Sequence, residues 1–325
     1  MSELPLSRTL CVLKILEQYS DETHPLTLQQ IIALLREQYG LNAHRTTLTK
    51  DIEELSAYGV DIVKQQSTQN RYFIGSRVFE IPELRLLIDA IHSSKCLTPK
   101  KSEELIDKLT SLASVHQGKR LRERPLYTMV TKPKNEQIYY IIDTVNRAIE
   151  LGKQIRFQYL EYQPDKTTVL RNDGEIYALS PYACMWNGDY YYVVGWTEKH
   201  RALTSFRVDR IASVPEITDV PILPPPKGVD PEEYSKTVFQ MYSGPLATVQ
   251  LQCRNDLMKT IIDRFGEDVE VIDHDETHFT VSVKVMLSPP FYGWLFEFGG
   301  KIRLVSPDIA IDIYKQMMES AFADL

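Results

Sequence analysis

The chain has 325 residues, of which 43% are hydrophobic and 25% charged, a composition that is ordinary for a globular protein and excludes a mostly disordered chain. At roughly 100–200 residues per domain, this length predicts about two or three domains. The 44 acidic residues outnumber the 37 basic ones and leave a net charge of −7, which argues against a protein that binds nucleic acid non-specifically with its whole surface.

The N-terminal residues do not resemble a targeting segment. Arg8 and Lys14 interrupt the first apolar run, and no small-residue cleavage site follows it. No stretch of the chain approaches the roughly 18 uncharged apolar residues that a membrane span needs. We therefore expect a soluble, cytoplasmic protein.

Two helices are predicted first. Apolar residues recur at helical spacing over 8–19. A second helix begins after Thr27, which forms a capping-box pattern with Gln30, and it ends at Gly40.

A third helix and a hairpin complete the first 80 residues. The helix covers about 44–58 and Gly59 ends it. Residues 60–76 alternate apolar and polar residues around the polar turn 67–70, which is typical of a small hairpin. Three helices followed by a hairpin are the outline of a winged helix-turn-helix, so we assign residues 1–80 to a DNA-binding domain.

Residues 81–135 predict a helical connector. Two helices are expected between 82 and 115, the second opened by Thr98 and Pro99. The polar and basic stretch 116–137 contains two prolines and is interpreted as a linker or as a strand that docks elsewhere.

Residues 136–220 change character. One more amphipathic helix ends at Gly152, and short strands with alternating or aromatic sequences follow. Asn187 and Gly188 lie between two aromatic, β-branched runs and predict a tight hairpin. Antiparallel strands at this spacing predict a small β-barrel.

Residues 221–325 predict a separate C-terminal domain. The run 221–226 contains three successive prolines and is expected to form a boundary. Beyond it the pattern reads strand, helix, strand, strand, helix, strand, helix, which resembles a ferredoxin-like unit. The fold class is therefore multidomain α+β.

The charge is unevenly distributed over these segments. The acidic excess is seven residues in 221–325 but only two in 1–80, and 81–135 carries a basic excess of five. The net charge of the whole chain therefore does not exclude DNA binding by its N-terminal part.

The predicted third helix carries the candidate DNA-binding residues. Its polar and basic side chains lie in the first two turns, ahead of acidic residues, as suits a helix that enters the major groove. With one residue of the hairpin, the candidates are His44, Arg45, Thr46, Thr47, Thr49, Lys50 and Arg71. The alternative is a polar helix face used only for protein contact.

The segment 44–52 resembles the reading helix of DeoR-type regulators, which commonly runs S-x-R-T-[IV]-x-R-D-[IL]. Thr47, Lys50 and Asp51 fit this pattern, whereas Thr46 stands where these regulators usually carry arginine. The resemblance implies a winged helix that reads double-stranded DNA.

A second candidate site lies in the predicted barrel. Ser205 and Arg207 share one strand face, and a bulge or strand end can bring Arg210 near them. Arginines beside tyrosines and a serine suit a phosphate, a nucleotide or single-stranded nucleic acid. The alternative is that both arginines pair with Asp209 and other surface acids.

Three segments of this region, 148–162, 180–196 and 205–211, resemble the WYL domain, an Sm/SH3-like barrel found attached to winged helices in bacterial regulators. The family's naming tripeptide falls on 191–193, as Tyr-Tyr-Val. The resemblance implies a sensor barrel for an anionic effector, a nucleotide or single-stranded nucleic acid. Carried over by motif, the effector-binding residues are Tyr159, Tyr182, Tyr192, Ser205, Arg207 and Arg210.

The end of the chain, 293–316, resembles the C-terminal extension of these regulators called WCX. Trp294, Gly299 and Pro307 stand at its usual landmarks. The resemblance implies dimer contact, and hence a homodimer, together with coupling to the effector.

No motif of an enzyme or a metal site was found. GxGxxG, GxxxxGK[ST], HExxH and GxSxG are absent, and the four cysteines are too far apart for a disulfide framework or a zinc site. His274 and His278 flank a predicted turn, where a solvent-exposed tip is expected rather than a pair of metal ligands. We expect no cofactor and no catalytic activity.

These observations predict a transcriptional regulator in which effector binding at the barrel changes the affinity of a dimer for operator DNA. Two other interpretations stay open. One is an enzyme that processes nucleotides or nucleic acid with the barrel as its active site. The other is a phage-defence adaptor whose winged helix contacts proteins.

Overall fold

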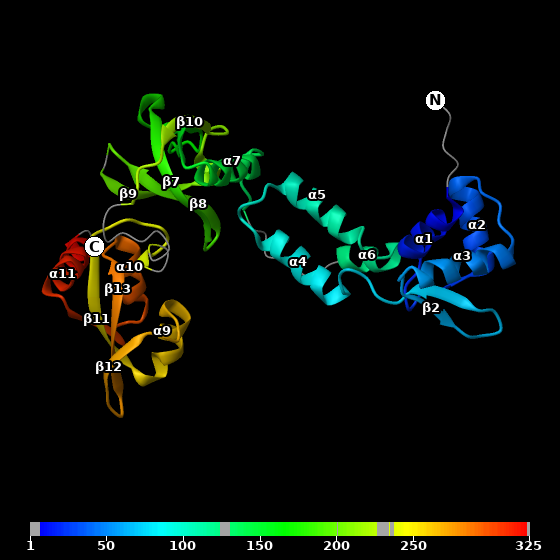
Figure 1. The fold of residues 1–325 in the computed structure, drawn as a ribbon. Helices are drawn as coiled ribbons and strands as arrows, with labels where there is room; N and C mark the ends of the chain where they lie inside the picture. The colour runs from blue at the N-terminus through cyan, green and yellow to red at the C-terminus, as the bar shows by residue number, and fades with distance from the viewer. Residues whose placement is uncertain (1–6, 124–130, 200, 226–233, 235–236, 324–325) are drawn as a thin grey trace. The chain divides into compact units, whose positions relative to one another are not determined.

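The computed structural model describes residues 7–123, 131–199, 201–225, 234 and 237–323. The chain divides into two compact units, residues 1–134 and 135–325, and both contain helices and antiparallel sheets (Figure 1). The protein is therefore a multidomain chain that mixes α and β structure. No described helix is long and apolar enough to cross a membrane.

The first unit begins with three helices and a three-stranded sheet in the order β1-β3-β2. The helices and the hairpin β2–β3 have the positions predicted from the sequence, whereas the two-residue strand β1 is too short to leave a periodic signal. The elements are α1 (Arg8–Tyr19), β1 (Leu26–Thr27), α2 (Leu28–Tyr39), α3 (Arg45–Ala57), β2 (Ile62–Gln65) and β3 (Arg71–Ile74).

Local sequence explains where these helices begin and end. The Thr27 hydroxyl accepts a hydrogen bond from the backbone N–H of Gln30, and the Gln30 side chain accepts one from the backbone N–H of Thr27. Gly40 then ends α2 in the left-handed conformation, with φ at 65°. Both signals were predicted and both are confirmed.

Three more helices complete the first unit: α4 (Ile81–Ser93), α5 (Pro99–Thr110) and α6 (Val115–Arg122). The helix α6 corrects the prediction of a linker or strand from residue 116, of which 124–130 lie outside the described residues. Its start is set by a capping box between Ser114 and Gln117, and Leu121 is buried. The helix has two large apolar residues, Val115 and Leu121, and only Leu121 is buried, so its sequence shows no clear periodicity and only packing against α4 and α5 reveals it.

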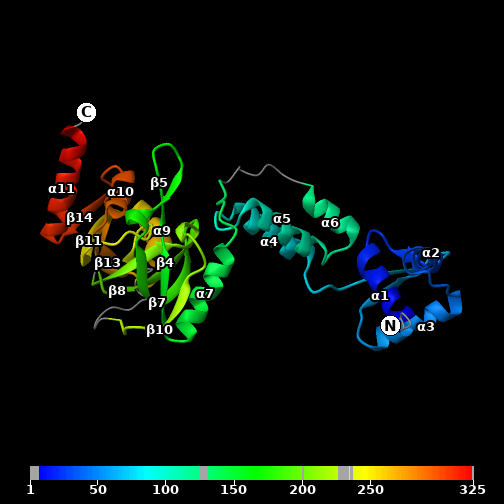
Figure 2. The same cartoon turned by 90° about the horizontal axis from the view of Figure 1, so that it is seen from above.

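The second unit opens with helix α7 (Ile138–Glu150) and a five-stranded antiparallel sheet in the order β10-β4-β7-β8-β9. Figure 2 shows α7 beside the sheet, and its buried residues share a core with β4, β7, β8 and β9. The strands of the sheet are β4 (Lys153–Gln158), β7 (Ile176–Asn187), β8 (Tyr190–Thr197), β9 (Ala202–Arg207) and β10 (Glu216–Pro221).

The tight turn between β7 and β8 is confirmed. Asn187 pairs with Tyr190, and Gly188 adopts a positive φ of 57° that a residue with a side chain rarely takes. A bridge between Tyr159 and Ile211 joins the chain after β4 to the chain after β9.

Strands β6 and β10 of this region were not predicted, and β5 was predicted only as the end of a single strand over 153–162. Strand β10 ends at Pro221, the first residue of the predicted boundary, and it pairs with β4. Strands β5 (Leu160–Tyr162) and β6 (Thr168–Leu170) form a separate two-stranded sheet. Strands β6 and β10 are largely exposed, so their sequences lack the alternation that marks a half-buried strand.

The C-terminal part contains every strand and helix predicted for it. Its four strands form an antiparallel sheet in the order β12-β13-β11-β14, and one face of the central pair is buried under the helices. The elements are β11 (Leu246–Arg254), α9 (Met258–Phe265), β12 (Glu270–His274), β13 (His278–Met286), α10 (Pro289–Glu297), β14 (Ile302–Ser306) and α11 (Asp308–Ala323).

Candidate functional site

A cleft with a cavity volume of about 1050 Å³ opens within residues 135–325. One side is formed by the ends of β8 and β9 and the short 3-10 turns η1 (Arg171–Gly174) and η2 (Val208–Arg210). The other side is formed by residues 238–243 and by parts of α9 and α10.

The lining of the cleft combines arginines with aromatic rings. The arginines are Arg171, Arg207, Arg210 and Arg264. The aromatic residues are Tyr159, Tyr190, Tyr192, Phe206, Phe239, Tyr242 and Trp294. Among the described residues, two carboxylates, Asp189 and Glu297, line the same cleft beside the four arginines, so this part of the lining favours an anionic ligand with a planar group.

The Arg207 guanidinium is held in place from two sides. Its Nε and Nη2 atoms donate hydrogen bonds of 3.0 and 2.8 Å to the Asp209 carboxylate. It also stacks over the Tyr190 ring, 3.3 Å from the centroid. Burial by itself lowers the pKa of Arg207, but the bonds to Asp209 outweigh it and raise that pKa above its usual value. Arg207 therefore pairs with Asp209, as the alternative interpretation expected, and also lines the cleft.

Arg210 differs from Arg207 because its Nε atom is buried and has no hydrogen-bond partner among the described residues. A buried guanidinium nitrogen without an acceptor is costly unless a ligand or water completes it. Arg210 thus lines the cleft with one guanidinium nitrogen, Nε, that has no acceptor among the described residues.

Tyr159 and Tyr192 support the cleft from within the sheet. The Tyr159 hydroxyl accepts a 3.0 Å hydrogen bond from the backbone N–H of Arg207. Burial raises the pKa of both tyrosines, so both stay neutral at physiological pH. Their side chains are almost fully buried, which suits residues that position Arg207 more than residues that bind ligand directly.

Ser205 reaches across the cleft. Its hydroxyl donates a 2.7 Å hydrogen bond to the backbone carbonyl of Met241, on the opposite side. Five of the six predicted effector residues therefore lie together: Tyr159, Tyr192, Ser205, Arg207 and Arg210.

Tyr182 is the exception, because it does not line this cleft. Its hydroxyl donates a 2.8 Å hydrogen bond to the carbonyl of Leu223. The pairing of β7 with β8 shifts register between Pro181 and Ala183, so strand alternation does not carry Tyr182 to the face of the other residues.

The cleft residues that were not among the predicted site residues include Arg171, Tyr190, Arg264 and Trp294. Tyr190 was within reach of sequence reasoning, because it opens the strand that contains Tyr192. Arg264 and Trp294 lie far along the chain, and no local pattern connects them to the sheet.

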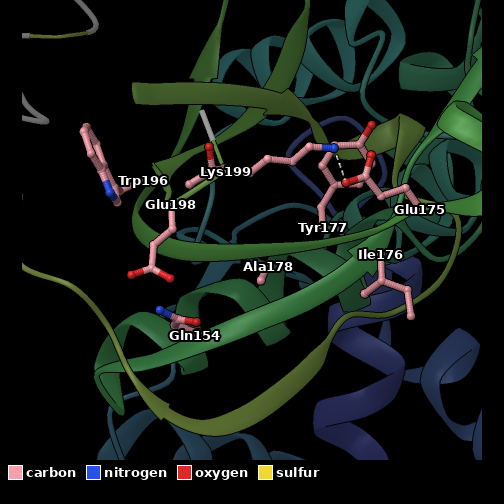
Figure 3. Close-up of a pocket in the computed structure, with 9 residues that line it drawn as sticks. Gln154, Glu175, Ile176, Tyr177, Ala178, Trp196, Glu198 and Lys199 are labelled. Carbon is pink, nitrogen blue, oxygen red and sulfur yellow. Dashed lines mark hydrogen bonds and ion pairs between the residues drawn. The ribbon is translucent and has the colours of Figure 1, made fainter. Parts of the chain in front are cut away.

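A smaller cavity of about 240 Å³ lies at the other end of β7 and β8 and contains none of the predicted effector residues. Figure 3 shows Lys199 directed toward Glu175, with which it forms an ion pair. That pairing leaves the Glu198 carboxylate as the remaining charge in the lining, so this cavity does not suit an anion.

The predicted DNA-binding residues lie mainly on the surface of the first unit. His44, Arg45, Thr46, Lys50 and Arg71 are exposed, whereas Thr47 and Thr49 are partly buried. The Thr49 hydroxyl is used within α3, donating 3.0 Å to the carbonyl of Arg45. Arg71 begins β3, next to the hairpin turn.

Asp51, in the same helix, has a structural role. Its carboxylate is buried and accepts hydrogen bonds of 2.6 and 2.9 Å from Arg8 and 3.1 Å from Thr9. The bond to Asp51 raises the pKa of Arg8. The pair ties the start of α1 to α3 and so orients the exposed residues Arg45 and Lys50.

Replacing Asp51 by alanine is expected to destabilise the contact between α1 and α3 by about 1–2 kcal/mol, because Arg8 and Thr9 lose their acceptor. Amide hydrogen exchange in α1 and α3 measures the change. Glu53→Ala, at an exposed position of the same helix, is the matched control and should change exchange little. If amide exchange were accelerated equally in Asp51→Ala and Glu53→Ala, the pair of Arg8 and Asp51 would not be what holds α1 against α3.

No group of three or more His, Cys, Asp or Glu side chains in the described part of the chain is placed to hold a metal ion. His274 and His278 flank the turn between β12 and β13, as predicted. The Asp275 carboxylate accepts hydrogen bonds from the backbone of Thr277 and His278, which lower its pKa to about 2.

Comparison with known proteins identifies one domain. Residues 140–216 match the WYL domain family. No curated protein matches the chain. Among solved structures, proteasome accessory factor B/C (PafBC) of Arthrobacter aurescens is similar to 93% of this chain at 15% identity, with a TM-score of 0.27. This chain spans 44% of that protein, and a TM-score this low does not establish a shared overall arrangement.

The matched range contains most of α7, the strands β4 to β9 and all six residues predicted to bind the effector. The predicted WYL domain is thereby confirmed, and residues 140–216 of this chain are a WYL domain.

Proposed function

We propose that the protein is a transcriptional regulator that binds specific duplex DNA and senses an anionic effector in the cleft of its WYL domain. The observation that carries this function is the cleft itself, where the described lining of a cavity of about 1050 Å³ includes four arginines, seven aromatic residues and two carboxylates. A nucleotide or a single-stranded nucleic acid offers both phosphates for the arginines and bases for the rings.

The DNA-binding part is assigned to residues 1–80 as a winged helix-turn-helix. Three helices followed by a hairpin support this assignment, with α3 as the reading helix. The exposed residues Arg45 and Lys50 lie in its first turns, where a reading helix contacts base edges and phosphates. His44, Thr46, Thr47, Thr49 and Arg71 complete the proposed interface.

The remaining domains follow the same proposal: a helical connector over 81–135, the WYL sensor as a small barrel over 136–220 and a WCX-like extension over 221–325. The strand order β14-β11-β13-β12 supports a ferredoxin-like fold for the extension. The protein acts as a homodimer in the cytoplasm and does not catalyse a reaction. Effector binding changes the affinity of the dimer for paired half-sites.

Substitutions in α3 and in the cleft should affect duplex binding and effector binding separately. Arg45→Ala with Lys50→Ala is expected to weaken binding to a selected duplex at least tenfold and to leave effector binding intact, because only the contacts to DNA are lost. Arg207→Ala should weaken effector binding and leave the basal affinity for duplex unchanged. The duplex is obtained by selection from random sequences, with and without added nucleotides or oligonucleotides.

Measuring duplex affinity at several salt concentrations gives a second test. Each phosphate contact that is lost reduces the salt dependence of that affinity. Lys259→Ala, in the C-terminal domain, serves as the control for a lost positive charge. Unchanged duplex binding in the Arg45 and Lys50 double variant would exclude α3 as the reading helix.

A further inference from the structure

The cleft has two walls, and only one of them belongs to the WYL domain. The WYL wall is formed by Arg171, Arg207 and Arg210 with the tyrosines of β8. The C-terminal wall lies outside 140–216 and is formed by residues 238–243, by Arg264 of α9 and by Trp294 of α10.

Arg264 is a partly buried cation on the C-terminal wall. It donates a 2.8 Å hydrogen bond to the carbonyl of Val238 and stacks 3.9 Å from the centroid of the Phe239 ring. Burial lowers its pKa, and none of the ion pairs formed by described residues includes it. An arginine fixed by a carbonyl and a ring, without a carboxylate partner, is well placed to bind an external anion.

The turn that begins this wall has an unfavourable backbone. Gln240 and Met241 have φ values of 50° and 60°, a conformation that two-residue turns normally reserve for Asn and Gly. Tyr242 donates a 3.0 Å backbone hydrogen bond to Phe239, which closes the turn. Non-glycine residues in this conformation are concentrated at ligand-binding and switch sites.

Contacts from the WYL domain hold the turn in place. Ser205 donates to the carbonyl of Met241, and the Met241 side chain is buried in one cluster with Tyr192 and Val194. The exposed ring of Tyr242 and the partly buried Trp294 remain on the lining of the cleft. The C-terminal wall therefore lines the cavity with one cation, Arg264, one carboxylate, Glu297, and three aromatic rings, those of Phe239, Tyr242 and Trp294.

The size of the cleft indicates how much ligand it takes. A cavity of about 1050 Å³ is slightly larger than the roughly 300–1,000 Å³ common for small-molecule sites. The WYL wall by itself includes three arginines and several aromatic rings, the kinds of group that bind the phosphate and the base of one nucleotide. A single nucleotide therefore leaves the C-terminal wall without a ligand group.

We propose that the C-terminal wall is a second subsite, in which Arg264 binds a phosphate and Trp294 stacks on a base of a ligand that contains at least two linked nucleotides. This inference rests on the proposed function, because it assumes that the WYL wall binds the first nucleotide. Residues outside the WYL domain then distinguish an oligonucleotide from a single nucleotide. Only a ligand long enough to reach both the WYL wall and the C-terminal wall then gains the contacts of the second subsite.

The test measures the affinity of the full chain for 5′-phosphorylated deoxythymidylates of one, two and four nucleotides by calorimetry. The dinucleotide is expected to bind the wild type about tenfold more tightly than the mononucleotide, because its second nucleotide adds a phosphate held by Arg264, which brings the second base onto Trp294. Arg264→Ala should abolish this gain and leave mononucleotide affinity unchanged. Arg207→Ala should weaken all three probes by a similar factor.

Two further variants guard against a loss of folding. Arg264→Gln keeps a donor for the Val238 carbonyl but removes the charge, and it should behave like Arg264→Ala. Arg254→Ala removes an exposed arginine of the same domain that is paired with Asp256, and it should change nothing. Circular dichroism confirms that each variant is folded.

The outcomes separate the two proposals. If the oligonucleotides bind but Arg264→Ala weakens every length equally, or none, the second subsite is wrong and the effector site stands. If none of the probes binds the wild type, a nucleotide effector is wrong, and the second subsite is wrong with it.

Discussion

Phe206→Ala is expected to lower the free energy of unfolding of the second unit by about 3–5 kcal/mol, the usual cost of removing a fully buried phenyl ring. The Phe206 side chain is 3% exposed. Its ring makes edge contacts with Phe157, Tyr159 and Tyr177, with centroids 5.1 to 5.3 Å away. The cavity left behind cannot close without moving several strands of the sheet.

The same substitution should impair effector binding. Phe206 lies in β9 between Ser205 and Arg207, and the backbone N–H of Arg207 is bound to Tyr159. Loosening this strand displaces the residues that line the cleft, so we expect a loss at least as large as that of Arg207→Ala.

Urea unfolding followed by tryptophan fluorescence measures the effect, because all three tryptophans lie in the second unit. Phe206→Leu retains most of the apolar volume and should cost less. Phe296→Ala, at a position that is 62% exposed, should change stability by less than about 0.5 kcal/mol. Similar losses for Phe206→Ala and Phe296→Ala would show that β9 does not depend on this ring.

Asp21→Ala is expected to destabilise the first unit by about 3 kcal/mol, because it removes the acceptor of a buried hydrogen-bond network. The Asp21 side chain is 1% exposed and accepts hydrogen bonds from Ser114, Thr23 and His24. Ser114 is also the N-cap of α6, so the network joins the end of α1 to the connector.

The network also predicts a pH dependence. Burial alone raises the pKa of Asp21, but the hydrogen bond from Ser114 and those from Thr23 and His24 outweigh it and hold that pKa well below the usual value. The unfolded carboxyl has a pKa of about 3.9. A group whose pKa is lower in the folded state contributes stability above the unfolded pKa. That contribution is lost as the pH falls toward the folded pKa.

Hydrogen exchange in peptides from α1 and α6 measures both effects. Asp21→Asn keeps one oxygen acceptor and should lose less stability than Asp21→Ala, while removing the acid-dependent part. Glu22→Ala, at the exposed neighbouring position, is the control. An acid-dependent loss that persists in Asp21→Asn would assign the pH dependence to another group.

Much of the secondary structure was predictable because its signals are local. The capping box of Thr27 and Gln30, the left-handed Gly40 and the Asn187-Gly188 turn depend only on neighbouring residues. The helices and strands of the C-terminal domain were likewise all predicted. Such features require no knowledge of the partners against which the elements pack.

Elements that depend on distant partners were missed. The helix α6 is polar along most of its length and packs through a few positions. Strand β10 has an exposed sequence and exists as a strand because β4 provides its hydrogen-bond partners. In both cases the stabilising contacts come from elsewhere in the chain, so the hydrophobic periodicity of the segment does not predict the helix or the strand.

The sequence by itself determined which residues could bind an anion, since Ser205, Arg207 and Arg210 occur together in one short segment. Only the tertiary structure decided that Tyr182 lies elsewhere and that Arg264 and Trp294 face the same cleft. The physical reason is that side-chain chemistry is a property of each residue, whereas the second wall of a cleft is created by packing between segments far apart in the chain.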